Sequence, residues 1–398
     1  MFALFQSARK SLRQFSLPVM LPFFAIGLAG CNTTAPSGIG NSGQYINTSE
    51  PVVVALLVPR GSSSANDNLL AESLENAALL AIRDLEDIKI DLRVYDTAGN
   101  AQTAAIQASQ AVTDGAKIIL GPVYAEAANA AAVAVAGRNV NILSFSNNTT
   151  IAGDNVFVLG QTFQNTANRM ISFAKSQNND RIVIAYANDV AGQLGHKAIQ
   201  SAISVFGATQ AGSVEYPLSQ EGVLAAIPLI KASVDDNDAN AIFMTSPSAS
   251  ALPLLTQLLP EAGISKARTQ FIGLTRWDIP ATTLDLPGVQ GGWFAIPDPA
   301  TSSAFRTQYL AAYEGQPHPI GSLAFDGIAA VGALIKMGKP NPLSKVAITQ
   351  SAGFKGANGI FRFLADGTNE RGLAIATIRN KKVVVIDNAP FSFNRANF

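Results

Sequence analysis

The sequence predicts an α/β protein made of two doubly wound parallel-sheet lobes with a cleft between them. Short apolar runs alternate with helical patterns along most of the 398 residues, as they do in parallel sheets covered by helices. The chain is also longer than a single hydrophobic core usually supports. Its composition, 48% hydrophobic and 14% charged, is typical of a compact protein rather than a disordered one.

The first lobe begins with residues 51–58 (PVVVALLV), a continuous apolar run rich in β-branched residues. Such a run is expected of a central parallel strand that is covered on both faces. The segment at residues 69–87 has one apolar helical face, and we expect Asn66 or Asp67 to cap this helix. A strand over residues 88–95 and a helix over residues 101–112 follow.

Residues 117–148 are the unit around which the first lobe is organised. An apolar run at residues 118–120 ends at Gly121-Pro122, an alanine-rich helical segment follows, and a second apolar run ends in Ser144, Ser146 and Asn147. Two parallel strands joined by a helix end on the same edge of a sheet, where open sheets bind ligands. The alternative is that these residues are simply polar strand ends, as any α/β protein has, and bind no ligand.

The alternation restarts after a polar stretch at residues 161–164, where we place the first crossing between lobes. Helices are expected at 166–175, 192–206, 223–232 and 249–261, and strands at 181–187, 210–216, 241–245 and 270–273. Residues 292–299 predict the return crossing, and helices at 303–313 and 323–337 follow. The predicted first lobe is therefore 51–162 with 297–350, and the second is 163–296 with 351–398, which ends in antiparallel strands with turns at 365–367 and 380–381.

The N-terminus has the pattern of an export signal. Basic residues precede an apolar stretch at residues 15–26 that is too short and too broken by proline to span a membrane. It closes with Leu28-Ala29-Gly30-Cys31, which resembles a bacterial lipobox, so residues 1–30 are expected to be a signal peptide and Cys31 a lipidation site. Cys31 is the only cysteine of the chain. A cleaved signal with a chance cysteine is the alternative.

We expect residues 31–50, rich in Gly, Ser, Thr and Asn, to form a flexible tether. Asn32, rather than an aspartate, follows the cysteine. By resemblance to Gram-negative sorting signals, this favours a protein that is anchored by its lipid to the outer membrane and faces the periplasm.

The sequence carries little that indicates catalysis, metal binding or nucleic-acid binding. Its formal net charge is +0, so the basic excess typical of nucleic-acid-binding proteins is missing. The two histidines, His196 and His318, have no cysteine or carboxylate at metal-ligand spacing. We find no nucleophile elbow, HExxH or P-loop, and we therefore predict a non-enzymatic protein without catalytic residues, metal or cofactor.

Three local patterns resemble the type I periplasmic-binding fold, in particular its leucine/isoleucine/valine-binding branch. Gly121-Pro122 with the following helix and residues 141–144 resembles the glycine-to-serine segment of that branch. Residues 323–328 (LAFDGI) resemble its Ala-Tyr-Asp-Ala helix, and residues 356–367 resemble its closing hairpin. The resemblance covers about residues 52–387. It implies two lobes joined by three crossings, a hinge near residues 161–164 and 296–299, and capture of an amino acid or similar small polar solute for an ABC permease.

The ligand positions of that branch are altered in this chain. Tyr124-Ala125-Glu126 stands where the amino-acid binders carry serines for the ligand carboxylate. Arg276 lies where the resemblance implies an acid for the ligand ammonium. Because an unpaired ammonium in a closed cleft is costly, a free α-amino acid is not a secure ligand.

The candidate ligand-binding residues follow strand ends in both lobes: Tyr124, Ser144, Ser146, Asn147, Asn188, Ser246, Arg276 and Trp277. Tyr124 and Trp277 are expected to supply stacking area. Arg276 favours an anionic ligand, because Arg binds planar anions through two hydrogen bonds. Exposure of Arg276 to solvent, or pairing with Asp278, is the alternative.

A second resemblance leads to a different function. Residues 55–59 (ALLVP), 121–123 (GPV) and 285–290 (DLPGVQ) look like segments of outer-membrane lipoproteins that activate penicillin-binding proteins. That resemblance implies contact with a peptidoglycan synthase instead of solute capture. Ligand-induced compaction of the two lobes would distinguish solute binding from activation, and both hypotheses stay open at the level of sequence.

Overall fold

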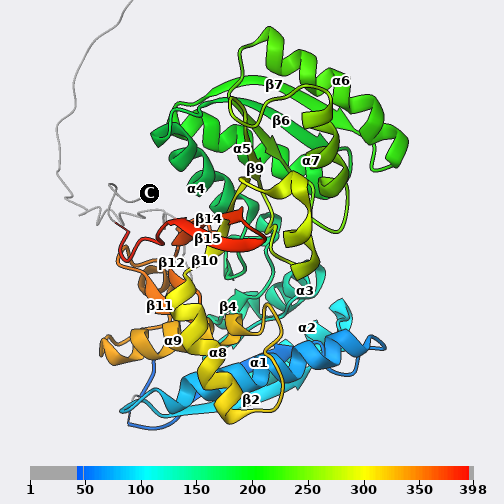
Figure 1. The fold of residues 1–398 in the computed structure, drawn as a ribbon. Coiled ribbons are helices and arrows are strands. Elements are labelled where there is room, and N and C mark those ends of the chain that lie inside the picture. The colour runs from blue at the N-terminus through cyan, green and yellow to red at the C-terminus, as the bar shows by residue number, and fades with distance from the viewer. Residues whose placement is uncertain (1–42, 48, 394–398) are drawn as a thin grey trace, which may run out of the picture. The chain divides into compact units, whose positions relative to one another are not determined.

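The computed structural model describes residues 43–47 and 49–393 (Figure 1). The predicted signal peptide, Cys31 and most of the predicted tether lie outside these residues. Two sheets with helices on both faces form the two lobes that the sequence predicts. In the described part of the chain, no helix is long and apolar enough to cross a membrane.

In the described residues the first sheet has five parallel strands in the order β2-β1-β3-β4-β5. The strands are β1 Val52–Val58, β2 Ile90–Asp96, β3 Ile118–Leu120, β4 Asn141–Ser144 and β5 Val156–Val158. The predicted strand β1 pairs with β2 and β3, and its apolar side chains are buried on both faces. The predicted strand-helix-strand unit is also confirmed, because β3 and β4 are parallel neighbours on either side of α3.

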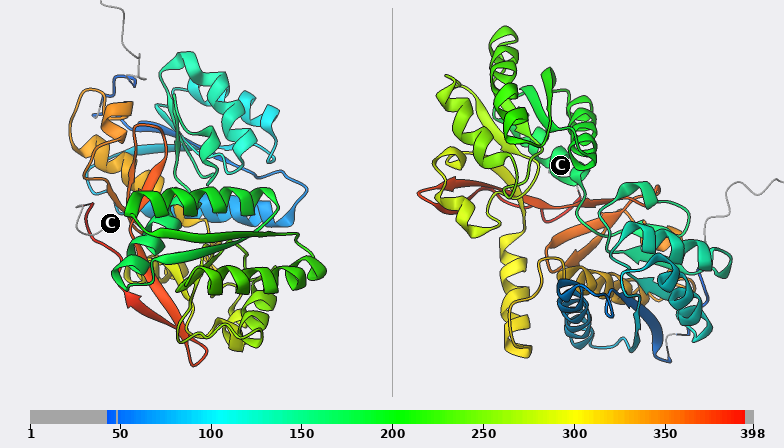
Figure 2. Two further views of the ribbon diagram at one scale, coloured as in Figure 1. Left: turned by 90° about the horizontal axis from the view of Figure 1, so that it is seen from above. Right: turned by 90° about the vertical axis from the view of Figure 1, so that its right-hand side faces the viewer.

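Helices cover both faces of the first sheet (Figure 2). They are α1 Ala65–Arg83, α2 Ala101–Thr113, α3 Ala125–Val135, α8 Pro299–Ala312, α9 Ser322–Lys336 and α10 Lys345–Ile348. Residues of α1 and α9 pack on one face, and residues of α2 and α3 pack on the other. The predicted cap of α1 is wrong: Ser64 precedes the helix and its Oγ accepts a hydrogen bond from the Asp67 amide.

The second sheet has seven strands among the described residues, in the order β15-β14-β10-β9-β8-β6-β7. The strands are β6 Arg181–Ala187, β7 Thr209–Tyr216, β8 Ala241–Met244, β9 Gln270–Gly273, β10 Trp293–Pro297, β14 Leu373–Arg379 and β15 Lys382–Asp387. The helices are α4 Phe163–Ser176 and α5 Val190–Phe206 on one face, with α6 Gln220–Asp236 and α7 Leu252–Glu261 on the other. Short 3-10 turns lie at Ala136–Arg138, Thr149–Ile151, Ala281–Asp285 and Pro287–Val289.

The closing segment corrects one predicted lobe boundary. Strands β11 Phe354–Gly356, β12 Gly359–Phe363 and β13 Asn369–Arg371 form a small antiparallel sheet. We assigned them to the second lobe, but their phenylalanines pack in the core of the first lobe with residues of α9. After β13 the closing segment enters the second sheet, where it forms β14 and β15. The predicted turn between β14 and β15 has positive φ at Asn380 and Lys381.

The last residues of the predicted tether pack against the first lobe. Ile46 is 5% exposed within that lobe's core. Gln44 accepts a hydrogen bond from Lys117 Nζ at 2.9 Å and donates one to the Arg138 carbonyl at 3.1 Å. These contacts contradict a flexible tether as far as residue 50, because an apolar side chain and an amide hold this part of the chain.

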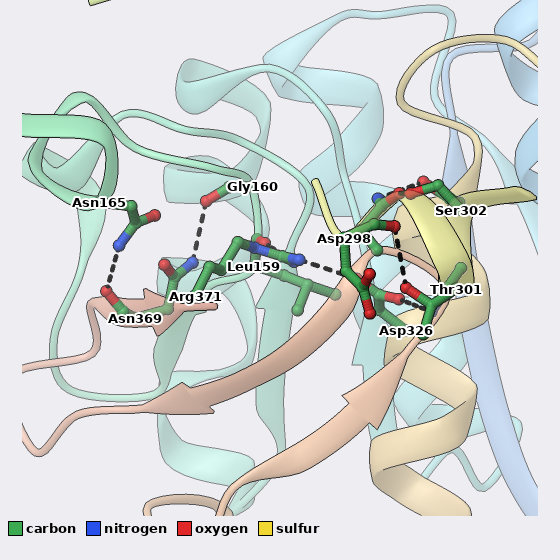
Figure 3. A network of polar contacts seen from close by, with 12 residues as sticks. Leu159, Gly160, Asn165, Asp298, Thr301, Ser302, Asp326, Asn369 and Arg371 are labelled. Carbon is green, nitrogen blue, oxygen red and sulfur yellow. Dashed lines mark hydrogen bonds and ion pairs between the residues drawn. The ribbon is translucent and has the colours of Figure 1, made fainter. Parts of the chain in front are cut away.

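A buried ion pair holds the crossings between the lobes together (Figure 3). Arg371, at the end of β13, pairs with Asp326 of α9 at 3.0 Å and donates to the Leu159 carbonyl at 2.5 Å. Burial raises the pKa of Asp326, while Arg371 and the amide of Ala357 lower it. Burial has the larger effect, so the pKa of Asp326 lies above its ordinary value.

Asparagine side chains extend this network to the first crossing. Asn369 Nδ2 donates to the carbonyls of Val158 at 2.7 Å and Gly160 at 2.9 Å. Asn165, in the first turn of α4, donates to the Asn369 carbonyl at 2.8 Å (Figure 3). The segments that enter and leave the second lobe are thus bonded to each other.

Trp277, which we predicted to line the cleft, lies in the core of the second lobe. Its ring has no exposed surface and stacks on Phe294 with 6.2 Å between ring centroids. Two glycines leave room for it: a Cβ on Gly273 would lie 2.1 Å from Trp277 Nε1, and one on Gly292 would lie 1.9 Å from Cζ3. The prediction for Trp277 was wrong because the strand that precedes it ends beside glycines that leave an apolar space for the indole.

We predict that replacing Asp326 with Ala lowers the free energy of unfolding by about 3–5 kcal/mol, because the guanidinium of Arg371 stays buried without its carboxylate. Urea unfolding of the purified protein measures this change. The matched control is Asp285→Ala, which removes an ion pair to Lys381 whose side chains are 68% and 66% exposed, and which should cost at most about 1 kcal/mol. Equal effects of the two substitutions would contradict the structural role of Asp326.

We predict that Gly292→Ala lowers the free energy of unfolding by about 1–3 kcal/mol, because the new methyl group overlaps the Trp277 ring and the core must shift. Gly137→Ala is the control, since nothing lies within 4 Å of a Cβ at that position. Thermal unfolding followed by tryptophan fluorescence compares the two variants. A Gly292→Ala protein as stable as wild type would place Trp277 outside the core.

Candidate ligand-binding cleft

A cavity of about 600 Å³ opens where the carboxyl edge of the first sheet meets the crossing segments and the loop after β9. Cavities of this size hold small organic ligands. Its wall has three parts, namely the first-lobe loops after β3 and β4, the loop after β9 in the second lobe, and the crossing segments.

The first part of the wall is the turn from β3 into α3. Gly121 has φ of +85°, and a Cβ there would lie 2.3 Å from the Leu57 carbonyl oxygen, so only glycine lets the chain turn here. Val123, Tyr124 and Ala125 line the cavity as α3 begins. No side chain of the described residues caps this helix, so its first amides and the positive end of its dipole are available to a negatively charged group.

Tyr124 lies on the cavity wall as predicted and is 41% exposed. Its hydroxyl donates a 2.5 Å hydrogen bond to Asp67. That bond, together with partial burial, raises the pKa of Tyr124 to about 12. The phenol is therefore neutral near pH 7 and offers its ring, while its proton is committed to Asp67.

The loop after β4 contributes Phe145, Ser146, Asn147 and Asn148 to the wall. Ser144 does not line the cavity: it has no exposed surface and donates to the Pro122 carbonyl at 3.0 Å. Its Oγ also accepts a 3.2 Å hydrogen bond from the Ser146 amide. Ser144 therefore fixes the loops after β3 and β4 to one another.

The second lobe contributes Arg276 and Ile279 to the wall. Arg276 Nε donates to Asp278 Oδ1 at 2.9 Å, and Nη2 donates to Oδ2. Arg276 thus lines the cavity, as predicted, and also pairs with Asp278, which was the alternative. Neither bond uses Nη1, so the guanidinium is oriented by Asp278 and keeps donors for another partner.

Two other predicted residues of the second lobe do not reach the cavity. Ser246 is 1% exposed and its hydroxyl is hydrogen-bonded to Tyr216. Asn188 is exposed just before α5, where its backbone amide donates to the Tyr216 carbonyl at 2.9 Å. Both follow strand ends as the sequence indicates, but the hydroxyl of Ser246 is hydrogen-bonded to Tyr216, and Asn188 is not among the residues that line the cavity.

Sequence reasoning missed the third part of the wall. It consists of Gly160, Gln161, Pro297, Ser302, Pro319, Ile320, Ser322, Leu323, Asn358 and Arg371. These residues come from segments far apart in the chain, and only the crossings at 161 and 297 were marked by sequence. Asn358 and Arg371 belong to a hairpin whose position next to α9 depends on the buried Asp326.

Among the described residues that line the cavity, Arg276 and Arg371 are the charged ones. Each is paired with a carboxylate that lies behind the wall, Asp278 and Asp326 respectively. The wall thus presents hydrogen-bond donors and no acidic side chain. In the part of the chain that the structure describes, no group of three or more His, Cys, Asp or Glu side chains could hold a metal ion.

Comparison with solved structures shows the same fold at low sequence identity. A branched-chain amino acid ABC transporter protein from Rhodospirillum rubrum is similar with a TM-score of 0.72 and 16% identity, over 85% of this chain and 100% of that one. A branched-chain amino acid transporter substrate binding protein from Streptococcus pneumoniae, in complex with isoleucine, has a TM-score of 0.57 and 16% identity over 86% and 100%. A solute binding protein from Rhodopseudomonas palustris, in complex with 3,4-dihydroxy benzoic acid, has a TM-score of 0.59 and 17% identity over 87% and 98%.

Among curated proteins, the search finds no match to the sequence. The family described as periplasmic binding protein matches residues 51–382, which include the first sheet, the second sheet as far as β14 and every part of the cavity wall. This match agrees with the fold and with the position of the cavity between crossing segments. The chain therefore belongs to the periplasmic binding protein family.

Proposed function

We propose that the protein is an extracytoplasmic, non-enzymatic solute-binding component of an ABC transporter, and that it captures a small carboxylate with an apolar body. The observation that carries this proposal is the cavity of about 600 Å³, whose charged lining residues are two arginines. The family supports solute capture. The chemistry of the wall supports the class of solute.

Two sets of donors suit a carboxylate. The uncapped first turn of α3 offers backbone amides at the positive end of the helix dipole. Arg276, held by Asp278, keeps Nη1 for a second partner. A ligand ammonium would meet no carboxylate on this wall, and leaving it unpaired in a closed cleft is costly. An acid without an amino group therefore fits better than a zwitterionic amino acid.

The rest of the wall is largely apolar. Phe145, Ile279, Ile320 and Leu323 line it together with prolines of the crossing segments. Such a surface favours a hydrocarbon or aromatic body, because burying it removes apolar area from water. Of the similar structures, one is in complex with isoleucine and another with an aromatic acid, so the choice of solute class rests on the wall of this cavity.

One of the three segments that suggested a penicillin-binding protein activator, residues 285–290, has a structural explanation. Val289 has no exposed surface and lies in the core of the second lobe. Lys266 donates to the carbonyls of Pro287 at 3.2 Å and Gly288 at 2.6 Å, which fixes the turn. Packing accounts for this segment, so solute capture is the function we favour.

We predict that Arg276→Ala weakens binding of a carboxylate ligand by about 10- to 100-fold, equivalent to about 1.5–3 kcal/mol for a hydrogen bond to a charged group. Isothermal titration calorimetry with a panel of aliphatic and aromatic acids measures the loss. Arg268→Ala, an exposed arginine outside the cavity, is the control. Unchanged affinity in the Arg276 variant would remove this residue from the site, and a preference for zwitterionic amino acids would contradict the proposed solute class.

The location of the protein is part of the same proposal. We predict that Cys31 is acylated and anchors the protein to a membrane facing the periplasm, most simply the outer membrane. Cys31→Ser should move the protein from the membrane fraction to the soluble periplasmic fraction, as seen by fractionation and immunoblotting. Retention of the serine variant in the membrane at the wild-type level would refute the anchor.

A further inference from the structure

A polar cluster of three side chains, Ser302, Asn358 and Ser322, lies on the crossing-segment wall of the cavity. Ser302 Oγ donates to Asn358 Oδ1 at 3.3 Å, and Asn358 Nδ2 donates to Ser322 Oγ at 2.7 Å. The cluster joins the first turn of α8, the β11–β12 turn and the first residue of α9. It faces a cavity whose neighbouring wall is mostly apolar.

The cluster retains hydrogen-bonding capacity that the fold does not use. Ser302 donates its hydroxyl hydrogen to Asn358. Ser322 Oγ accepts a hydrogen bond from Asn358, so its own hydroxyl hydrogen is not used in the cluster. If the Asn358 amide is turned by 180°, the two serines exchange roles. Within residues 43–47 and 49–393, neither hydroxyl makes a further hydrogen bond. In both arrangements the pair offers one free hydrogen and free lone pairs.

The cluster is rigidly held. The Asn358 carbonyl accepts from the Asp298 amide at 3.2 Å, and the neighbouring Ala357 amide donates to Asp326 at 2.8 Å. The same Asp326 pairs with Arg371, which is 5% exposed and also lines the cavity. Arg371 Nε is buried and has no acceptor among the described residues.

We propose that Ser302, Asn358 and Ser322 form a subsite for a hydroxyl group, either alcoholic or phenolic, on the bound solute. A hydroxyl both donates and accepts, so it can use the free hydrogen of one serine and the lone pairs of the other at once. A carbonyl offers no hydrogen and an ammonium offers no acceptor, so each leaves one serine unused. This inference rests on the proposed function and narrows the solute class to hydroxy carboxylates.

Phenol and toluene test the subsite without a carboxylate, because they differ only in the hydroxyl group. The side-chain amide signal of Asn358 in the ¹⁵N-labelled protein should shift saturably with phenol at millimolar concentration and stay unchanged with toluene. Ser302→Ala and Ser322→Ala should each weaken phenol binding by about threefold to tenfold, the scale of one neutral hydrogen bond. Ser303→Ala, an exposed neighbour on α8 outside the cavity, is the matched control.

A second arm uses acids and separates this inference from the proposed function. Wild-type protein should bind 4-hydroxybenzoate at least about threefold more tightly than benzoate, and the two serine variants should lose this preference. Arg276→Ala should weaken the binding of both acids alike and leave phenol binding unchanged.

If both acids bind equally in wild type and phenol causes no shift at Asn358, the hydroxyl subsite is overturned while carboxylate capture stands. If phenol binds at Asn358 but Arg276→Ala leaves the acids unaffected, the carboxylate proposal fails instead, and absence of binding by every probe overturns both.

Discussion

The buried pairing of Arg371 with Asp326 is the interaction on which the arrangement of the crossings depends. A charged guanidinium that is 5% exposed needs a carboxylate and further acceptors, and it finds them in α9 and in the Leu159 carbonyl. Asp326 lies in α9 of the first lobe, Leu159 lies just before the first crossing, and Arg371 lies just before the chain enters β14 of the second sheet. The need to satisfy one cation therefore fixes the segments that join the two lobes.

The same ion pair reaches the ligand cavity. Asp326 holds the Ala357 amide, and the adjacent Asn358 bonds to the serines at the start of α8 and α9. A solute that contacts Asn358 would thus contact the segment that the buried pair positions. Residues of the cavity wall are therefore bonded to the segments that join the two lobes.

Patterns within short stretches predicted the elements and the first-lobe loops well. The run at 51–58 became the central strand β1, and the unit at 117–148 placed Tyr124, Ser146 and Asn147 on the cavity. Both results depend on rules that act over a few residues, namely burial of apolar runs and the common edge of parallel strands. The lobe assignment of residues 354–371 failed, because strand pattern alone does not say which core receives their phenylalanines.

The sequence by itself determined the two α/β lobes, the order of strands and helices, and the strand edge at which a ligand would bind. The tertiary structure decided which polar strand ends face the cavity. Trp277 and Ser246 follow strands just as Tyr124 does, yet both are buried in the second lobe. Trp277 fills the space beside Gly273 and Gly292. The hydroxyl of Ser246 is hydrogen-bonded to Tyr216. Only the fold brings Ser302, Ser322, Asn358 and Arg371 to one wall, because their contacts span tens of residues and arise from the partners that buried charges and amides require.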